Sequence, residues 1–148
     1  MEQKEIIERL NDLIQLDVDA VEAYDHAIRH VAFQDIRKRF RGFQEDHGAH
    51  IKNLTELVLQ LGGTPVKAKP DLKGYLLEGF TTLMSLTGTK SALEAMKMNE
   101  KLTNRKYEEA AAWDLPEEVA KLLRVNLSQE QRHLSYIEEL LSIPRREL

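Results

Sequence analysis

The hydrophobic pattern of the chain predicts long amphipathic helices. Apolar side chains recur at alternating spacings of three and four residues, which places them on one face of a helix. Four long stretches follow this pattern, and a shorter one lies between the second and the third. We therefore predict helices over about residues 2–31, 35–61, 72–86, 90–113 and 115–142.

Capping residues mark several of the predicted helix ends. Gly62 follows the second helix at a position suited to a left-handed cap. Ser91 and Glu94 have the spacing of a capping box, and Asp114 is expected to cap the last helix. Short connections within each pair of helices favour antiparallel neighbours. We expect an all-α, antiparallel four-helix bundle in a single domain, with a long crossover at about residues 62–90 that contains the short helix.

The predicted buried faces carry ionisable side chains. In the last helix a carboxylate and an imidazole lie at the centre of the apolar stripe formed by Val119, Leu123, Asn126, Glu130, His133, Ile137 and Leu140. The other long helices carry similar interruptions. Burying a charge costs several kcal/mol unless another group compensates it. The polar residues placed on these faces are Asp17, Gln44, His47, Glu100, Glu130 and His133.

The two halves of the chain resemble each other. Asp17 and Glu100 each precede a tyrosine, Tyr24 or Tyr107, by about two helical turns, so acid and tyrosine share a face. We therefore expect two hairpins, related by a pseudo-twofold, whose polar side chains meet in one layer of the core.

The second helices of the two halves can be aligned on their histidines. This alignment pairs His47 with His133 and Gln44 with Glu130. His50, one turn beyond His47, is a further candidate for binding a metal ion. Asp46 has the right chemistry but a less suitable helical phase.

Composition limits the chemistry that these residues can perform. The chain has 148 residues, 42% hydrophobic and 31% charged, and no cysteine, so a metal would be held by His, Asp, Glu or Gln. A formal net charge of −4 gives no electrostatic case for nucleic acid or an acidic membrane. The charged N-terminus is unlike a signal peptide, and no apolar run approaches the roughly 20 residues of a membrane span. A cytoplasmic location is expected.

The polar pattern resembles that of the ferritin-like di-metal carboxylate family. In that family two helices each contribute one Glu, and each of the other two contributes Glu-x-x-His. The turns that begin at Leu61 and Trp113 are also similar to those of a poorly characterised bacterial branch of unknown function, some of whose members are linked to stress. The resemblance implies metal ligands at Asp17, Gln44, His47, Glu100, Glu130 and His133, with Tyr24, Tyr107 and His50 beside them.

The first half departs from the family pattern twice. Asp17 replaces Glu, and Gln44 replaces the bridging Glu, so three carboxylates face the site instead of four. The resemblance implies iron or manganese, as one well-held ion rather than two, and oxidation of Fe(II) or reaction with oxygen or peroxide. The alternative is a non-catalytic bundle with a vestigial, empty site that acts through its surface, as a homodimer or in stress physiology.

Overall fold

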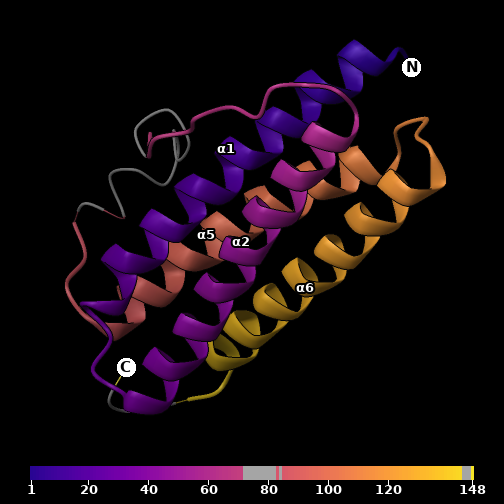
Figure 1. Cartoon of the computed structure of the whole chain (residues 1–148). Helices are drawn as coiled ribbons and strands as arrows, with labels where there is room; N and C mark the ends of the chain where they lie inside the picture. The colour runs from indigo at the N-terminus through magenta and orange to yellow at the C-terminus, as the bar shows by residue number, and fades with distance from the viewer. Residues whose placement is uncertain (72–82, 84, 145–147) are drawn as a thin grey trace.

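The computed structural model describes residues 1–71, 83, 85–144 and 148. Within these residues four long helices form: α1 (Gln3–Ile28), α2 (Gln34–Gln60), α5 (Thr89–Ala111) and α6 (Glu117–Ser142). Helix α1 packs against α2 and α5, and α6 packs against α5 and α2. Figure 1 shows the four helices side by side in one elongated bundle. The predicted all-α architecture of two helical hairpins is confirmed.

The buried faces of the helices follow the sequence pattern. In α6 the fully buried residues are the predicted stripe without its last member, Leu140, which is partly buried. In α2 the buried face includes His50 as well as the predicted His47. The ionisable interruptions are therefore inside the bundle, as predicted.

Helix α1 ends earlier than the pattern suggests, at Ile28 instead of near Val31. The N–H groups of His30 and Val31 bond to carbonyls three residues back, at Ala27 and Ile28. Such bonds form a turn tighter than an α-helix. Val31 nevertheless remains buried, so the hydrophobic pattern continues beyond the helix itself.

The start of α5 lies just before the predicted capping box. The N-cap is Gly88, and the Ser91 hydroxyl oxygen accepts hydrogen bonds from the N–H groups of Thr87 and Gly88, at 2.9 and 3.2 Å. Ser91 therefore satisfies backbone donors from within the first turn instead of capping the helix from outside.

The predicted Asp114 cap of α6 is wrong. The helix begins at Glu117, with Pro116 in an extended conformation as its N-cap and no side-chain cap bond. A residue before proline is disfavoured in the α region, so Leu115 resists joining the helix. The proline thus moves the start of the helix past the aspartate.

The turn after α2 is a glycine C-cap of the predicted kind. Gly62 has φ of 82°, and its N–H bonds to the Leu59 carbonyl. The Gly63 N–H bonds to the Val58 carbonyl at 2.9 Å. These two bonds form a Schellman motif, which satisfies carbonyls at the end of the helix.

The short crossover helix predicted over residues 72–86 falls largely outside the described residues. Of its predicted apolar face, Leu83 is described and is buried. On either side of the gap the chain leaves α2 and enters α5, as a crossover between hairpins requires.

Two apolar clusters fill the bundle, with a polar layer between them. On α1, Leu10 and Ile14 belong to one cluster and Ala23 and Ile28 to the other, with Asp17 in between. On each of the other three long helices, too, the buried ionisable residues lie between the two clusters. The clusters close both ends of the layer and keep water away from it.

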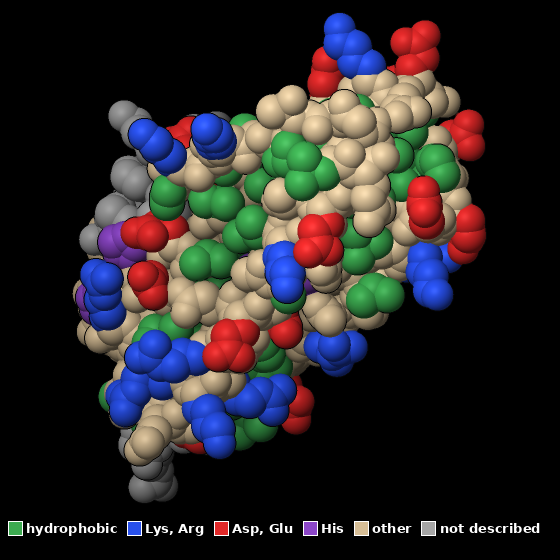
Figure 2. Space-filling view, in the orientation of Figure 1, with side chains coloured by type: hydrophobic (Ala, Val, Ile, Leu, Met, Phe, Trp, Pro, Cys, Tyr) green, Lys and Arg blue, Asp and Glu red, His purple; other side chains and the backbone are tan. Residues whose placement is uncertain are grey.

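The surface carries charges of both signs. In Figure 2 acidic and basic side chains are interspersed over the middle of the visible face, while Lys and Arg gather at its lower end, near the start of α2. Among the described helices, none is both long and apolar enough to cross a membrane.

The turn at Gly63 has no room for a side chain. A Cβ atom there would lie 2.6 Å from Cγ2 of Ile7, whereas one at Gly48 in α2 meets nothing within 4 Å. We expect Gly63→Ala to lower the free energy of unfolding by about 1–3 kcal/mol, as overpacking does. Gly48→Ala should raise it by about 0.5–1 kcal/mol, as in other helix interiors. Urea denaturation measures both, and equal effects of the two variants would contradict the close packing of Gly63 on Ile7.

Candidate metal centre

The polar layer joins ionisable side chains from all four long helices. Each of these side chains is 0–1% exposed. Their potential ligand atoms form two overlapping groups, in each of which the atoms lie within 4.8 Å of one another. The groups are Asp17, His47, His50 and Glu130, and His47, Glu100, Glu130 and His133.

The imidazole of His47 lies at the centre of the layer. Its Nδ1 is 2.7 Å from Oδ1 of Asp17 and 3.3 Å from Oε1 of Glu130. Its Nε2 is 3.1 Å from Oε1 of Glu100. One side chain from α2 therefore touches a carboxylate from each of the other three helices.

Two buried tyrosines bind the carboxylates across the bundle. The Tyr24 hydroxyl of α1 donates to Oε1 of Glu100 in α5, at 2.5 Å. The Tyr107 hydroxyl of α5 donates to Oδ2 of Asp17 in α1, at 2.6 Å. The predicted shared face of acid and tyrosine thus becomes a reciprocal pair of contacts between the two hairpins.

The outer nitrogens of two histidines have polar partners near the bundle surface. Nε2 of His133 is 2.7 Å from Oδ2 of Asp46, and Nε2 of His50 is 2.5 Å from Oε1 of Gln129. The Asp46 side chain is 39% exposed, whereas that of His133 is 1% exposed. The helical phase of Asp46 points away from the stripe, which made it a poor candidate in the sequence, but its side chain reaches the edge of the layer.

The contacts relate the two halves in a different register from the histidine alignment. Asp46 and Gln129 come directly before His47 and Glu130, and each contacts the outer histidine of the opposite helix. One constant sequence spacing matches Asp17 to Glu100, Tyr24 to Tyr107, His47 to Glu130, and His50 to His133. His47 therefore occupies the place of Glu130, and α2 carries His-x-x-His where α6 carries Glu-x-x-His.

Gln44 is partly buried, and its amide nitrogen binds groups of α1. Its amide nitrogen donates to the Val21 carbonyl at 2.9 Å and to Oδ1 of Asp25 at 3.0 Å. It lies one turn from His47 towards the start of α2, below the layer in which the carboxylates meet. The other predicted ligands, together with His50, are all in the layer.

Thr103 of α5 also belongs to the layer, although its residue type alone did not mark it as part of the site. Its hydroxyl oxygen lies 3.0 Å from Oε2 of Glu130 and 3.2 Å from Oε2 of Glu100. Asn104 donates from its side-chain amide to the backbone carbonyls of both Glu100 and Glu130. These contacts fix the two glutamates of α5 and α6 beside each other.

The carboxylates raise the pKa values of the histidines. Burial alone would lower the pKa of His50 and of His133, but carboxylate partners outweigh it and raise these pKa values to about 9 and about 10. For His133 the main favourable partner is Asp46. Burial also opposes the charged form of His47, yet the surrounding carboxylates raise its pKa well above the usual value.

The histidines in turn separate the pKa values of the carboxyl groups. Burial would raise the pKa of Asp17 and of Glu100, but close contacts with neighbouring imidazoles lower both pKa values, that of Glu100 strongly. Burial raises the pKa of Glu130, and His47 only partly offsets this. In the absence of metal, three imidazoles and three carboxyl groups can balance one another.

Two buried atoms of the layer remain without a hydrogen bond from any described residue. They are Oε1 of Glu130 and Nδ1 of His133. Nδ1 of His133 lies 3.4 Å from Oε1 of Glu100, without hydrogen-bond geometry. Buried polar atoms without a hydrogen bond are rare in proteins, and a bound ion is one way in which such atoms are satisfied. Oxygen and imidazole donors suit iron or manganese, so the residues present fit such an ion.

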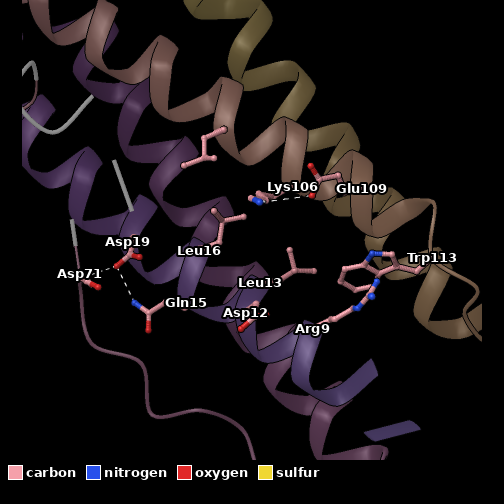
Figure 3. A pocket seen from close by; sticks show the side chains of 11 residues that line it. Arg9, Asp12, Leu13, Gln15, Leu16, Asp19, Asp71, Lys106, Glu109 and Trp113 are labelled. Carbon is pink, nitrogen blue, oxygen red and sulfur yellow. Dashed lines mark hydrogen bonds and ion pairs between the residues drawn. The ribbon is translucent and has the colours of Figure 1, made fainter. Parts of the chain in front are cut away.

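A separate surface cavity of about 790 Å³ opens between α1 and α5. Several of its charged side chains have local partners: Arg9 lies over the Trp113 ring, and Asp19 accepts hydrogen bonds from Gln15 and the Asp71 N–H (Figure 3). No side chain of the buried cluster lines this cavity. It therefore gives no access to the candidate metal centre.

Comparison with known proteins supports this fold. The family described as "Domain of unknown function (DUF2383)" matches residues 5–112, and the chain belongs to that family. A ferritin-like, diiron-carboxylate protein from Bacillus anthracis str. Ames has a similar crystal structure, with a TM-score of 0.76 and 24% sequence identity. The match covers 96% of this chain and 100% of that one. No curated protein matches the chain. The predicted resemblance to a ferritin-like branch of unknown function is confirmed.

The metal-free protein should lose stability as the pH rises from about 6.5 towards 10. The pKa values of His50 and His133 are raised in the folded state, from 6.5 to about 9 and about 10. Their charged forms therefore stabilise the fold fully below the unfolded pKa, and this contribution disappears as the pH passes the folded values. Urea unfolding with a chelator at pH 6 and at pH 9.5 measures the difference. His133→Gln should reduce it and the exposed His30→Ala should not; an unchanged or rising free energy of unfolding in the wild type would contradict this electrostatic interpretation.

Proposed function

We propose that the polar layer binds iron or manganese, and that the metal-loaded protein oxidises Fe(II) or reacts with oxygen or peroxide. The observation that carries the proposal is the pair of atoms without a hydrogen bond from a described residue, Glu130 Oε1 and His133 Nδ1, inside a buried layer of carboxylates and imidazoles. An ion bound there would give both atoms a partner.

The donor set narrows the choice of metal. Each of the two groups of ligand atoms contains two histidines and two carboxylates. Histidine and carboxylate ligands with open positions are typical of non-haem Fe(II) sites, and the chain has no cysteine for softer ions. Iron bound in this way supplies one-electron chemistry towards oxygen or peroxide.

The residues of the chain hold, orient and connect this centre. Tyr24 and Tyr107 fix one oxygen each of Glu100 and Asp17, which limits the rotation of these carboxylates. The His133 Nε2–Asp46 contact links the buried layer to a partly exposed carboxylate. It provides a route by which a proton released in the layer can reach solvent.

A second candidate function follows from the charge balance of the layer. Three imidazolium groups can compensate three carboxylates without any metal, and the raised histidine pKa values reflect how strongly they interact. The protein would then be a non-catalytic bundle that acts through its surface, with the layer as a structural remnant. This candidate predicts no specific metal binding.

Thermal unfolding with and without metal separates the two candidates. At a free Fe(II) or Mn(II) concentration 100 times Kd, binding stabilises the native state by about 2.7 kcal/mol. For a chain of this size we expect a rise in Tm of several degrees under anaerobic conditions. Glu130→Ala and His133→Ala should lose the rise, each judged against its own metal-free Tm, while His30→Ala at the surface should keep it.

Oxidation is then followed by absorbance after oxygen or peroxide is added to the Fe(II)-loaded protein. The wild type should oxidise bound Fe(II) faster than buffer alone, and Glu130→Ala should not. If neither metal raises the Tm of the wild type, the result would favour the non-catalytic bundle. If Glu130→Ala binds and oxidises Fe(II) normally, the polar layer is not the metal site.

A further inference from the structure

We infer that the layer holds one ion per chain, in the half formed by His47, Glu100, Glu130 and His133, with Asp17 and Asp46 as the residues that position the two histidines. This inference rests on the proposed metal binding and goes beyond it. It replaces a symmetric pair of sites by a single site on the α5/α6 side of the layer.

The ring nitrogens of two histidines point to this half. Nδ1 of His47 makes the shorter contact, 2.7 Å, to Asp17, which leaves Nε2 facing Glu100 at 3.1 Å. Nε2 of His133 contacts Asp46 at 2.7 Å, which leaves Nδ1 facing the same glutamate. A histidine that ligates a metal usually donates its other N–H to a carboxylate, which fixes the tautomer and the ring. Both histidines have this arrangement, and their other ring nitrogens converge on Glu100.

His47 cannot serve both groups at once. A neutral imidazole has one N–H and one lone pair, so it ligates a single ion. The lone pair of His47 lies at Nε2 when Nδ1–H donates to Asp17. This placement assigns His47 to the Glu100 half and leaves the other half without one of the two ligands that the groups share.

Asp17 is already engaged with donors from the chain. Its Oδ1 lies within hydrogen-bond distance of His47 and His50, and its Oδ2 accepts from Tyr107. Glu130 Oε1, by contrast, has no hydrogen bond from any described residue. Asp17 is therefore satisfied without an ion, whereas Glu130, which both groups share, keeps an oxygen available to one.

The two halves also differ in the partner of their outer histidine. His133 contacts the carboxylate of Asp46, whereas His50 contacts the neutral amide of Gln129. A carboxylate partner makes an imidazole a stronger ligand than an amide partner does. In addition, two glutamates neutralise one divalent ion, which limits the cost of burying it.

The test uses the full-length, metal-free protein and Mn(II). We expect one Mn(II) per chain in equilibrium dialysis, with the six-line electron paramagnetic resonance spectrum of an isolated ion. Anomalous diffraction from crystals soaked in Mn(II) should place the ion beside Glu100 and His133. Two ions per chain with a spin-coupled spectrum, or an ion beside Asp17 and His50, would overturn the inference while leaving metal binding intact. Absence of any Mn(II) or Fe(II) binding would overturn both.

The internal repeat supplies matched variants. Glu100→Gln and His133→Gln should weaken Mn(II) binding more than 100-fold. Their counterparts in the other half, Asp17→Asn and His50→Gln, should still bind one ion, Asp17→Asn with about 10–100-fold lower affinity because His47 loses its orienting partner. The opposite pattern of retention and loss would assign the ion to the other half. Thermal unfolding of each metal-free variant shows whether it is folded.

The positioning role of Asp46 can be tested without disturbing the core, because its side chain is partly exposed. Asp46→Asn should lower the affinity for Mn(II) about 10–100-fold and Asp46→Glu should largely restore it. Gln129→Ala, the matched change beside His50, should leave the affinity unchanged. Equal effects of Asp46→Asn and Gln129→Ala, or no effect of either, would contradict the assignment of His133.

Discussion

The contacts of His47 with three carboxylates are the interactions on which the core depends. Buried carboxylates repel one another and lose their hydration, and such costs are of the same order as the stability of a whole domain. One imidazole that touches a carboxylate on each of the other helices reduces this cost at the centre. Hydroxyl groups of two tyrosines and of Thr103 bind further oxygens of the same carboxylates. Apolar clusters on both sides of the layer can then pack without an uncompensated charge between them.

The two hairpins repeat the same backbone arrangement but carry different side chains, which makes the polar layer asymmetric. The two hairpins place equivalent side chains at equivalent points, but Asp17 stands opposite Glu100, and His47 opposite Glu130. The partner of the outer histidine also differs, because His133 contacts the carboxylate of Asp46 and His50 contacts the amide of Gln129. The difference in partner favours the outer histidine of the half that contains Glu100, because a carboxylate partner makes an imidazole a stronger ligand. The asymmetry thus lies in a few side chains, while the backbone remains pseudo-symmetric.

Much of this arrangement could be predicted from the sequence, and the errors have physical causes. The helices and their buried faces follow from spacing alone, which identified Asp17, His47, Glu100, Glu130 and His133 as members of the core. The register between α2 and α6 did not follow, because a shift by about one helical turn leaves an amphipathic pattern almost unchanged. Gln44 and His47 therefore seemed as suitable a pair as His47 and His50. Asp46 was ranked as a poor candidate because its helical phase points away from the stripe, but a side chain at the edge of a helix face reaches atoms that its Cβ direction does not indicate.

The layer is balanced in two different ways, and this bears on how an ion would be held. Without metal, protons on the imidazoles compensate the carboxylates, and a bound ion would take over that role from the protons on the same nitrogens. Proton and ion would then compete for His47 and His133, and binding would release protons. Because the imidazole protons would compensate the carboxylates when no ion is bound, the fold would not depend on the ion. Such a centre would differ from a structural ion without which a chain does not fold.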